Sequence, residues 1–177
     1  AAARGARVTL VTTVEPPSVS GIEVVGVETA AEMAEAVWDR AASCDVAVLA
    51  AAVADFRPAQ PAPVKLRRTD GPPQLALEPT PDILAGVAAM ASRPFLVGFA
   101  AETGSIEGAV AKARSKGVDL LVANDVSAAG SGFGTEGNQV ALILPDGSVE
   151  QWDLLPKRRV AARLWERIAD LRGRSPS

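Results

Sequence analysis

The chain has 177 residues and a formal net charge of −3, so its length suits one domain and its charge does not favour binding to nucleic acid. No apolar run approaches the ~20 residues that a membrane-spanning helix needs, and we expect a cytoplasmic protein without membrane contact. The sequence has no histidine, which excludes Ser-His-Asp and Cys-His catalysis. Its single cysteine, Cys44, cannot form an internal disulfide, and we expect it to be a small packing residue.

The first half of the chain alternates short strands with one helix. Gly5 is expected to stop a helix ahead of a strand at residues 8–13, and a second strand is predicted at residues 22–27. Thr29 is expected to cap a helix over residues 30–42. Residues 45–53 form a continuous apolar run, which is typical of a parallel strand covered on both faces.

The second half continues this alternation and then changes character. Apolar strands are predicted at 95–100 and 120–123, and helices at 81–92 and 105–116. The pattern predicts a doubly wound, mostly parallel Rossmann-like α/β sheet with helices on both faces. A C-terminal β-hairpin is expected at 139–154, turning at Asp146-Gly147, followed by a helix at about 156–171 and a frayed tail at 173–177.

Small and polar residues follow each predicted parallel strand, where open α/β sheets bind their ligands. The first strand leads to Asp55, the second to Gly98 through Glu102, and the third to Asn124 and Asp125. Any one of these segments could instead be a helix cap or a turn. Three together indicate a site at the carboxyl ends of the strands.

Residues 58–79 form a long, proline-rich segment that we interpret as a flap. It carries Lys65, Arg67 and Arg68, with Arg57 just upstream, and fixed cations of this kind suit phosphoryl chemistry. A solvated surface loop is the alternative. Thr80 and Pro81 then suit the cap and first turn of a helix, whose N-terminus could also receive an anion.

The glycines of residues 132–137 match the spacing of a dinucleotide fingerprint. They lead into a predicted strand rather than a helix, so a pyrophosphate would lack the helix N-terminus that the motif supplies. We therefore reject NAD binding at this segment and interpret it as a glycine-rich loop.

Five segments, in order, resemble the phosphopantothenoylcysteine synthetase (phosphopantothenate–cysteine ligase) family, which most bacteria fuse to a flavin-dependent decarboxylase. They are residues 50–58 (AAAVADFRP), 65–68 (KLRR), 80–83 (TPDI), 97–103 (VGFAAET) and 123–127 (ANDVS). The resemblance covers nearly the whole chain. It implies coenzyme A biosynthesis by ligation of 4′-phosphopantothenate to L-cysteine with CTP and Mg²⁺, through an acyl-cytidylate, with release of pyrophosphate and CMP.

The resemblance also implies roles for individual residues. Lys65 corresponds to the catalytic flap lysine, while Arg57, Asn124 and Asp125 are candidates for the substrate side. Lys112 and Lys116 resemble two lysines that meet the triphosphate, although their spacing from Phe99 is one residue shorter than in the family. The complete set expected on the nucleotide side is Ala50, Ala51, Ala52, Asp55, Thr80, Pro81, Asp82, Ile83, Phe99, Lys112 and Lys116.

The domain is expected to occupy residues 1–177 and to form a homodimer, with the hairpin at 139–154 as a possible contact. A doubly wound domain should open with a strand and a glycine-rich loop, and we expect these to precede Ala1. Two alternatives to the ligase remain: a non-catalytic nucleotide-binding regulatory domain and an NAD(P)-dependent oxidoreductase.

Overall fold

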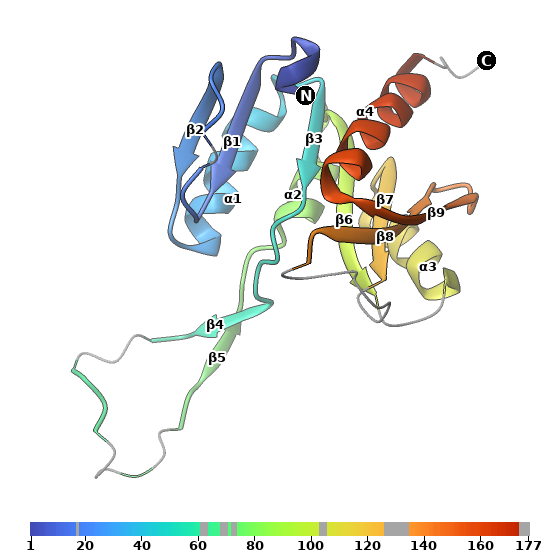
Figure 1. Cartoon of the computed structure of the whole chain (residues 1–177). Coiled ribbons are helices and arrows are strands. Elements are labelled where there is room, and N and C mark those ends of the chain that lie inside the picture. The colour runs from blue at the N-terminus through green and yellow to red at the C-terminus, as the bar shows by residue number, and fades with distance from the viewer. Residues whose placement is uncertain are drawn as a thin grey trace.

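The structure is a computed structural model that describes residues 1–16, 18–60, 64–67, 71, 74–102, 106–125 and 135–173, without the side chains of 101, 102, 106, 107 and 125. Its order of elements is that of an α/β protein (Figure 1). Within the described part of the chain, no helix combines the length and apolar character that crossing a membrane requires.

A five-stranded sheet forms the larger half of the molecule, in the order β3-β6-β7-β8-β9. Its parallel strands are β3 (Val46–Leu49), β6 (Phe95–Glu102) and β7 (Leu120–Asp125). The antiparallel strands β8 (Gly137–Ile143) and β9 (Val149–Pro156) follow as the predicted hairpin. This confirms the mostly parallel α/β fold.

Helices cover both faces of this sheet. On one face, α1 (Ala30–Ala41), α2 (Ile83–Ala88) and α3 (Ile106–Lys116) pack over a cluster that includes Leu96 and Leu121. On the other, α4 (Lys157–Gly173) packs over Leu120 and Leu142. The sheet is therefore doubly wound, with its core centred on β6, β7 and β8.

A second, two-stranded sheet forms the smaller half, with β1 (Val8–Thr12) parallel to β2 (Ile22–Gly26). Before it, a short 3-10 helix, η1 (Ala2–Arg4), stops at Gly5, whose φ of 81° places it in the left-handed conformation that glycine favours. Helix α1 begins with the predicted capping box, because Thr29 accepts from the Glu32 backbone while the Glu32 carboxylate accepts from the backbone of Thr29.

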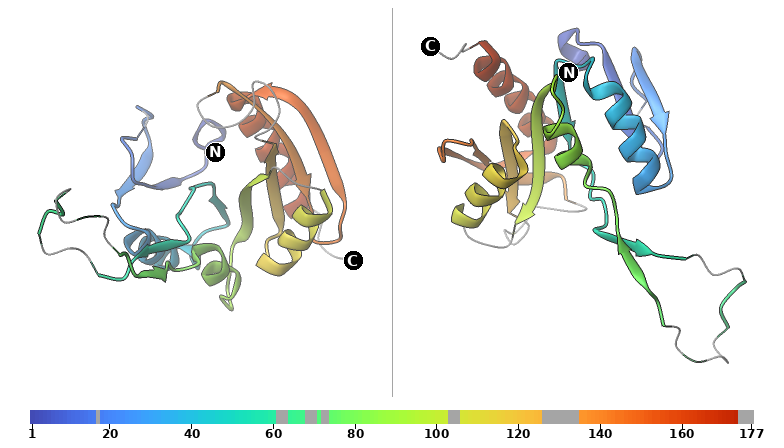
Figure 2. Two further views of the ribbon diagram at one scale, coloured as in Figure 1. Left: turned by 90° about the horizontal axis from the view of Figure 1, so that it is seen from below. Right: turned by 180° about the vertical axis from the view of Figure 1, so that it is seen from behind.

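The predicted flap begins and ends in a two-stranded antiparallel ladder of β4 (Phe56–Pro58) and β5 (Leu77–Pro79). The ladder and the described residues between its strands stand away from both sheets (Figures 1 and 2). The described large apolar side chains of this arm are exposed, among them Val64 and Leu75. We call the segment 56–79 the arm below.

Three sequence predictions need correction. The helix predicted at 81–92 is the shorter α2, which begins after its N-cap Asp82 instead of Thr80 and ends at Ala88. The apolar run 45–53 supplies a strand only to Leu49. Val48 is 38% exposed, and within the described residues β3 pairs with β6 on one edge alone. Cys44 is exposed rather than packed.

Candidate functional site at the carboxyl ends of the strands

A cavity of about 590 Å³ lies between the two halves of the molecule. Its walls come from β1, α1, β3 with the loop that follows it, the start of α2, β6 and α3. Of the residues expected on the nucleotide side, all except Ala52 line it: Ala50, Ala51, Asp55, Thr80, Pro81, Asp82, Ile83, Phe99, Lys112 and Lys116. Predicted residues up to 66 positions apart in the sequence thus meet at one place. The sequence placed Asp55 there from the end of a strand, and Thr80 to Ile83, Lys112 and Lys116 from the family resemblance.

The loop after β3 is fixed to the segment that precedes α2. The Thr80 hydroxyl donates to the backbone carbonyl of Ala54, and the Thr80 backbone N–H donates to the carbonyl of Asp55 over 2.9 Å. Thr80 therefore positions the loop of small residues instead of capping a helix. Alanines in this loop leave room for a ligand to approach the backbone closely.

An ion pair between Asp82 and Lys116 closes one side of the cavity. Lys116 Nζ lies 2.5 Å from Asp82 Oδ2, while Asp82 Oδ1 accepts from the Ala85 backbone N–H at 2.9 Å. The Lys116 hydrogen bond, with the Ala85 one second, holds the pKa of Asp82 below its ordinary value. The Asp82 carboxylate already accepts the hydrogen bond of the Ala85 N–H in the first turn of α2. A ligand at this side of the cavity would therefore contact the Asp82 side chain and not that N–H group.

Two lysines of α3 supply positive charge to this wall. Lys112 and Lys116 are four residues apart, which places them on the same face of a helix, and both line the cavity. Lys112 is exposed and Lys116 half-buried. A polyphosphate in the cavity would meet cations on one side and the small residues of the β3 loop on the other.

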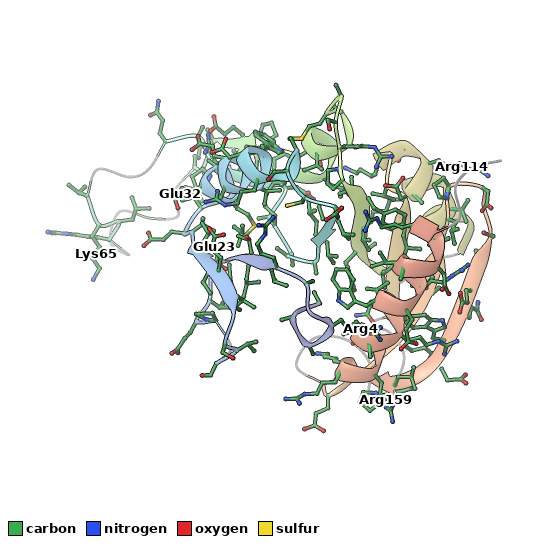
Figure 3. The ribbon with its side chains drawn as sticks, turned by 90° about the horizontal axis from the view of Figure 1, so that it is seen from above. Arg4, Glu23, Glu32, Lys65, Arg114 and Arg159 are labelled. Atoms are coloured by element: carbon green, nitrogen blue, oxygen red, sulfur yellow. The ribbon has the colours of Figure 1, made fainter. Side chains whose placement is uncertain are left out.

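The structure does not bring every predicted residue to this cavity. Lys65 is exposed on the arm and points away from the body of the molecule (Figure 3). Arg57 pairs with Glu78 over 2.7 Å across the arm's ladder. Asn124 is a half-buried residue of β7, and Asp125 ends that strand with its side chain outside the described part. Asn124 is outside the cavity lining, and the roles of both residues stay predictions.

Other predicted features fall on residues that are not described. They are Arg68 of the basic cluster, Thr103, Val126 and Ser127 of the family-like segments, residues 132–134 of the glycine-rich loop, and the tail at 174–177. Gly137 is described, and it begins β8. A strand, not a helix, therefore follows these glycines, as the rejection of the dinucleotide motif requires.

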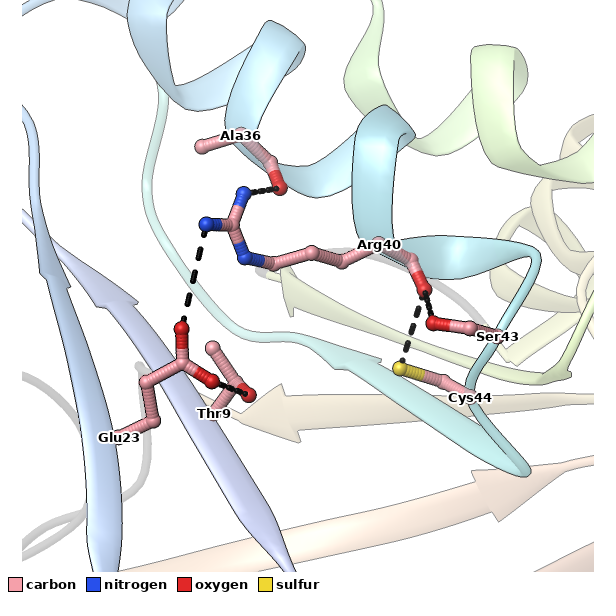
Figure 4. Close-up of polar contacts among 6 residues, drawn as sticks. All are labelled: Thr9, Glu23, Ala36, Arg40, Ser43 and Cys44. Atoms are coloured by element: carbon pink, nitrogen blue, oxygen red, sulfur yellow. Dashed lines mark hydrogen bonds and ion pairs between the residues drawn. The ribbon is translucent and has the colours of Figure 1, made fainter.

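Sequence reasoning missed the part of the cavity at the amino ends of the strands. Arg40 in the last turn of α1 donates to the Ala36 carbonyl over 3.1 Å and lies 4.0 Å from Glu23 of β2 (Figure 4). Glu23 also accepts from the Thr9 hydroxyl at 2.9 Å, and the Cys44 thiol donates to the carbonyl of Arg40. Thr9, Arg40 and Cys44 all line the cavity, but nothing in their local sequence distinguishes them from ordinary surface positions.

A doubly wound sheet with a cavity at the carboxyl ends of its parallel strands defines a Rossmann-like α/β domain. The chain belongs to the family described as the DNA/pantothenate metabolism flavoprotein C-terminal domain, whose profile matches residues 1–171. This family is consistent with the resemblance that the sequence segments carry.

Curated relatives match the chain almost end to end. The coenzyme A biosynthesis bifunctional protein CoaBC of Vibrio parahaemolyticus is 40% identical over 97% of this chain and 44% of its own length. The protein of the same description from Mycobacterium tuberculosis is 41% identical over 95% of this chain and 43% of its own. A prokaryotic protein described as a cysteine/cysteine sulfinic acid decarboxylase is 40% identical over 97% of this chain and 49% of its own length. The chain therefore spans less than half the length of these relatives.

Among solved structures, the crystal structure of the C-terminal domain of a CoaBC protein aligns with a TM-score of 0.74 and 38% identity. The alignment covers 96% of this chain and 78% of that one. A DNA/pantothenate metabolism flavoprotein from Streptococcus pneumoniae aligns with a TM-score of 0.75 at 18% identity, which supports the fold.

Proposed function

We propose that this domain is a CTP-dependent phosphopantothenate–cysteine ligase that acts in coenzyme A biosynthesis. The observation that carries the proposal is the convergence of the family-like segments at residues 50–55 and 80–83 with Phe99, Lys112 and Lys116 on one cavity. Relatives at about 40% identity that are described as coenzyme A biosynthesis proteins support the pathway. The homodimer and the fused decarboxylase belong to the same proposal.

The proposed reaction has two steps. The carboxylate of 4′-phosphopantothenate attacks the α-phosphate of CTP, so that a carboxyl–phosphate bond forms and pyrophosphate leaves. The amine of L-cysteine then attacks the acyl carbon, an amide bond forms, and CMP leaves. Each step moves negative charge onto phosphate oxygens, and positioned cations stabilise such transition states.

The residues of the chain divide these tasks. The loop at 50–55 receives the nucleotide closely because its side chains are small, and Lys112 and Lys116 meet the triphosphate. Lys65 would have to approach the cavity with the arm, so it acts in the closed complex in this proposal. Arg57, Asn124 and Asp125 remain candidates for contacts with the acyl substrate.

Magnesium would enter with the triphosphate. No group of three or more Asp, Glu, Cys or His side chains lies together in the described residues. The described side chains therefore do not suit a Mg²⁺ site whose ligands all come from the protein. It suits the usual mode of Mg²⁺ in nucleotide sites, where phosphate oxygens, water and one or two carboxylates supply the ligands. Asp55 lines the cavity and is the carboxylate best placed for this task.

Pyrophosphate release tests this function. The full-length protein or an amino-terminally extended domain is incubated with CTP, Mg²⁺ and 4′-phosphopantothenate, with and without L-cysteine. The ligase predicts pyrophosphate formation and cysteine-dependent release of CMP. Binding of CTP without either product would favour the non-catalytic regulatory domain, and binding of NADH in place of CTP would favour an oxidoreductase.

A further inference from the structure

Helix α3 turns three faces towards three different parts of the molecule. Ala109 and Ala113 are at most 2% exposed and pack against the sheet. Lys112 and Lys116 line the cavity. Arg114 is outside the cavity lining and lies on the side of the molecule opposite the arm (Figure 3), because two residues along a helix turn a side chain by about 200° around the axis. The helix that carries the two cavity lysines thus also carries a cation that faces elsewhere.

Arg114 binds the backbone of the turn between β8 and β9. Its Nε donates to the carbonyl of Pro145 over 2.9 Å, and its Nη2 donates to the carbonyl of Asp146 over 3.3 Å. A Cβ added to Gly147 would lie 3.0 Å from the same Nη2, so the guanidinium lies directly against the turn. Because a guanidinium is planar and its N–H groups point in fixed directions, two bonds to successive carbonyls fix both the distance and the orientation of the helix.

The turn that receives Arg114 is itself well defined. The backbone N–H of Leu144 donates to the carbonyl of Ser148 over 3.0 Å, and Gly147 has a φ of 93°, which glycine adopts readily. The Asp146 carboxylate accepts from the Ser148 hydroxyl over 2.6 Å and from its backbone N–H over 2.7 Å. These two bonds, and after them the charge of Arg114, hold the pKa of Asp146 below its ordinary value. The turn therefore provides a fixed point for α3.

The fully buried face of α3 gives the helix little lateral grip. Interlocking ridges of side chains set the orientation of a packed helix, and the side chains of Ala109 and Ala113 end at Cβ. The ion pair of Lys116 with Asp82 holds α3 from the side of α2, but a triphosphate that binds Lys116 would compete for this pair. The contact of Arg114 with the turn is outside the cavity, so a bound nucleotide leaves it in place.

We propose that Arg114 is a positioning residue for nucleotide binding, which ties α3 to the β8–β9 turn and so holds Lys112 and Lys116 at the cavity. This inference rests on the proposed function, in which the two lysines meet the triphosphate. It makes the turn, which is outside the cavity lining, a determinant of nucleotide affinity. By reciprocity, a bound nucleotide should slow amide exchange at the turn.

Calorimetric titration of the full-length protein with CTP and Mg²⁺ tests this inference. Arg114→Gln should raise the Kd for CTP about fivefold, the scale on which changes between two coupled sites act. In the pyrophosphate assay, KM for CTP should rise and kcat should stay nearly unchanged, as expected when only uniform binding is lost. Arg114→Lys keeps a donor for the turn and should recover most of the affinity. The melting temperature of each variant reports that it is folded during the titration.

Arg163→Gln is the matched control. Arg163 joins α4 to the same hairpin, at Glu150 of β9 over 3.4 Å, but none of the described residues of α4 lines the cavity. Its loss should therefore leave the Kd for CTP unchanged. Equal weakening in Arg163→Gln and Arg114→Gln would overturn the inference, because loss of either contact to the hairpin would then have the same effect.

A change on the turn side tests the same contact without replacing Arg114. Gly147→Ala places a Cβ against the guanidinium and should also weaken CTP binding. The double variant should bind CTP no more weakly than the weaker single variant, since both changes break one contact. Saturation with CTP should slow amide exchange at residues 144–148 in the parent protein and not in Arg114→Gln.

The outcomes separate this inference from the proposed function. A parent protein that binds no CTP overturns the proposed function, and the inference with it. A parent protein that binds CTP, with Arg114→Gln binding it equally tightly, overturns the inference alone. If Arg114→Gln does not fold, Gly147→Ala decides by the same comparison with the parent protein.

Discussion

The two halves of the molecule differ in how they bury their strands. The half built on β6, β7 and β8 has helices on both faces, and Leu96, Leu120, Leu121 and Leu142 are at most 1% exposed. In the half built on β1 and β2, every side chain of the two strands is half-buried or exposed. The cavity lies at the boundary. The well-packed half therefore carries the sheet and the two lysines of α3, and the less buried half carries part of the cavity wall.

The largest expected effect comes from testing this difference in packing directly. Leu142→Ala should lower the free energy of unfolding by about 2–5 kcal/mol, because it leaves a cavity in a fully buried site. Val48→Ala, at the open edge of β3, should cost less than about 1 kcal/mol by the area it removes from water. Urea unfolding measures both. Equal losses would show that the two halves are packed alike.

Lys65 tests whether the arm, remote from the cavity in this structure, takes part in the reaction. Lys65→Gln should lower kcat by about a hundredfold, the scale for loss of a group that stabilises transition-state charge, while the affinity for CTP stays nearly unchanged. Stopped-flow measurement of the two steps should assign the loss to attack by cysteine. Gln74→Ala, at an exposed and uncharged position of the same arm, is the control and should leave kcat unchanged. Unchanged turnover in Lys65→Gln would remove this role.

The contact between α1 and α2 is tight enough to test with one methyl group. A Cβ at Gly86 would lie 2.4 Å from the Trp38 indole nitrogen, which donates to the Ile83 carbonyl. Gly86→Ala should therefore destabilise the protein by about 1–3 kcal/mol, as overpacking does. Gly26→Ala meets no atom within 4 Å and should leave the melting temperature nearly unchanged. A neutral Gly86→Ala would mean that α1 moves freely relative to α2.

The lysines of α3 should bind the triphosphate from the well-packed side of the cavity. We expect Lys112→Gln and Lys116→Gln each to weaken CTP binding by about tenfold, or about 1.4 kcal/mol, in calorimetric titrations. Lys157→Gln, at the start of α4 and outside the cavity lining, serves as the control. The account is wrong about this wall if all three variants bind CTP equally.

The smallest effect concerns the charge of Asp82. Its folded-state pKa lies below the ordinary value of 3.8, so its contribution to stability is present above that value and is lost as the pH falls through the lowered pKa. Asp82→Asn keeps a capping side chain and should cost less than about 1 kcal/mol at pH 7, because the pair is exposed. Below pH 4 the free energies of unfolding of Asp82→Asn and of the parent protein should become equal. A difference that persists there would have another cause.

Sequence patterns predicted the framework well because local chemistry determines it. Thr29 with Glu32, Gly5 and Asp146-Gly147 each specify a cap or turn through groups within four residues, and the structure confirms them. The apolar runs likewise predicted β6 and β7. The ends of the parallel strands could be assigned to one edge, which placed Asp55 at the cavity. The other predicted lining residues came from the family resemblance.

The rest depends on contacts between distant segments, which no local pattern reports. Thr80 resembles a cap but bonds to Ala54, and Asp82 takes the capping position while pairing with Lys116. Cys44 and Arg40 line a cavity between β1 and β3, which lie in separate sheets in the described part of the chain. The position of Lys65 relative to the cavity depends on where the arm lies. The sequence of the arm shows that it is basic and rich in proline, but it does not predict where the arm lies.

Hydrogen–deuterium exchange with and without CTP tests the central claim, that the cavity between the two halves is the nucleotide site. The amino-terminally extended domain is saturated with CTP and Mg²⁺, and exchange is measured peptide by peptide. The account predicts the strongest protection at residues 50–55, 80–84 and 106–116, with little change in α4. Saturable binding that leaves these three segments unprotected would contradict it.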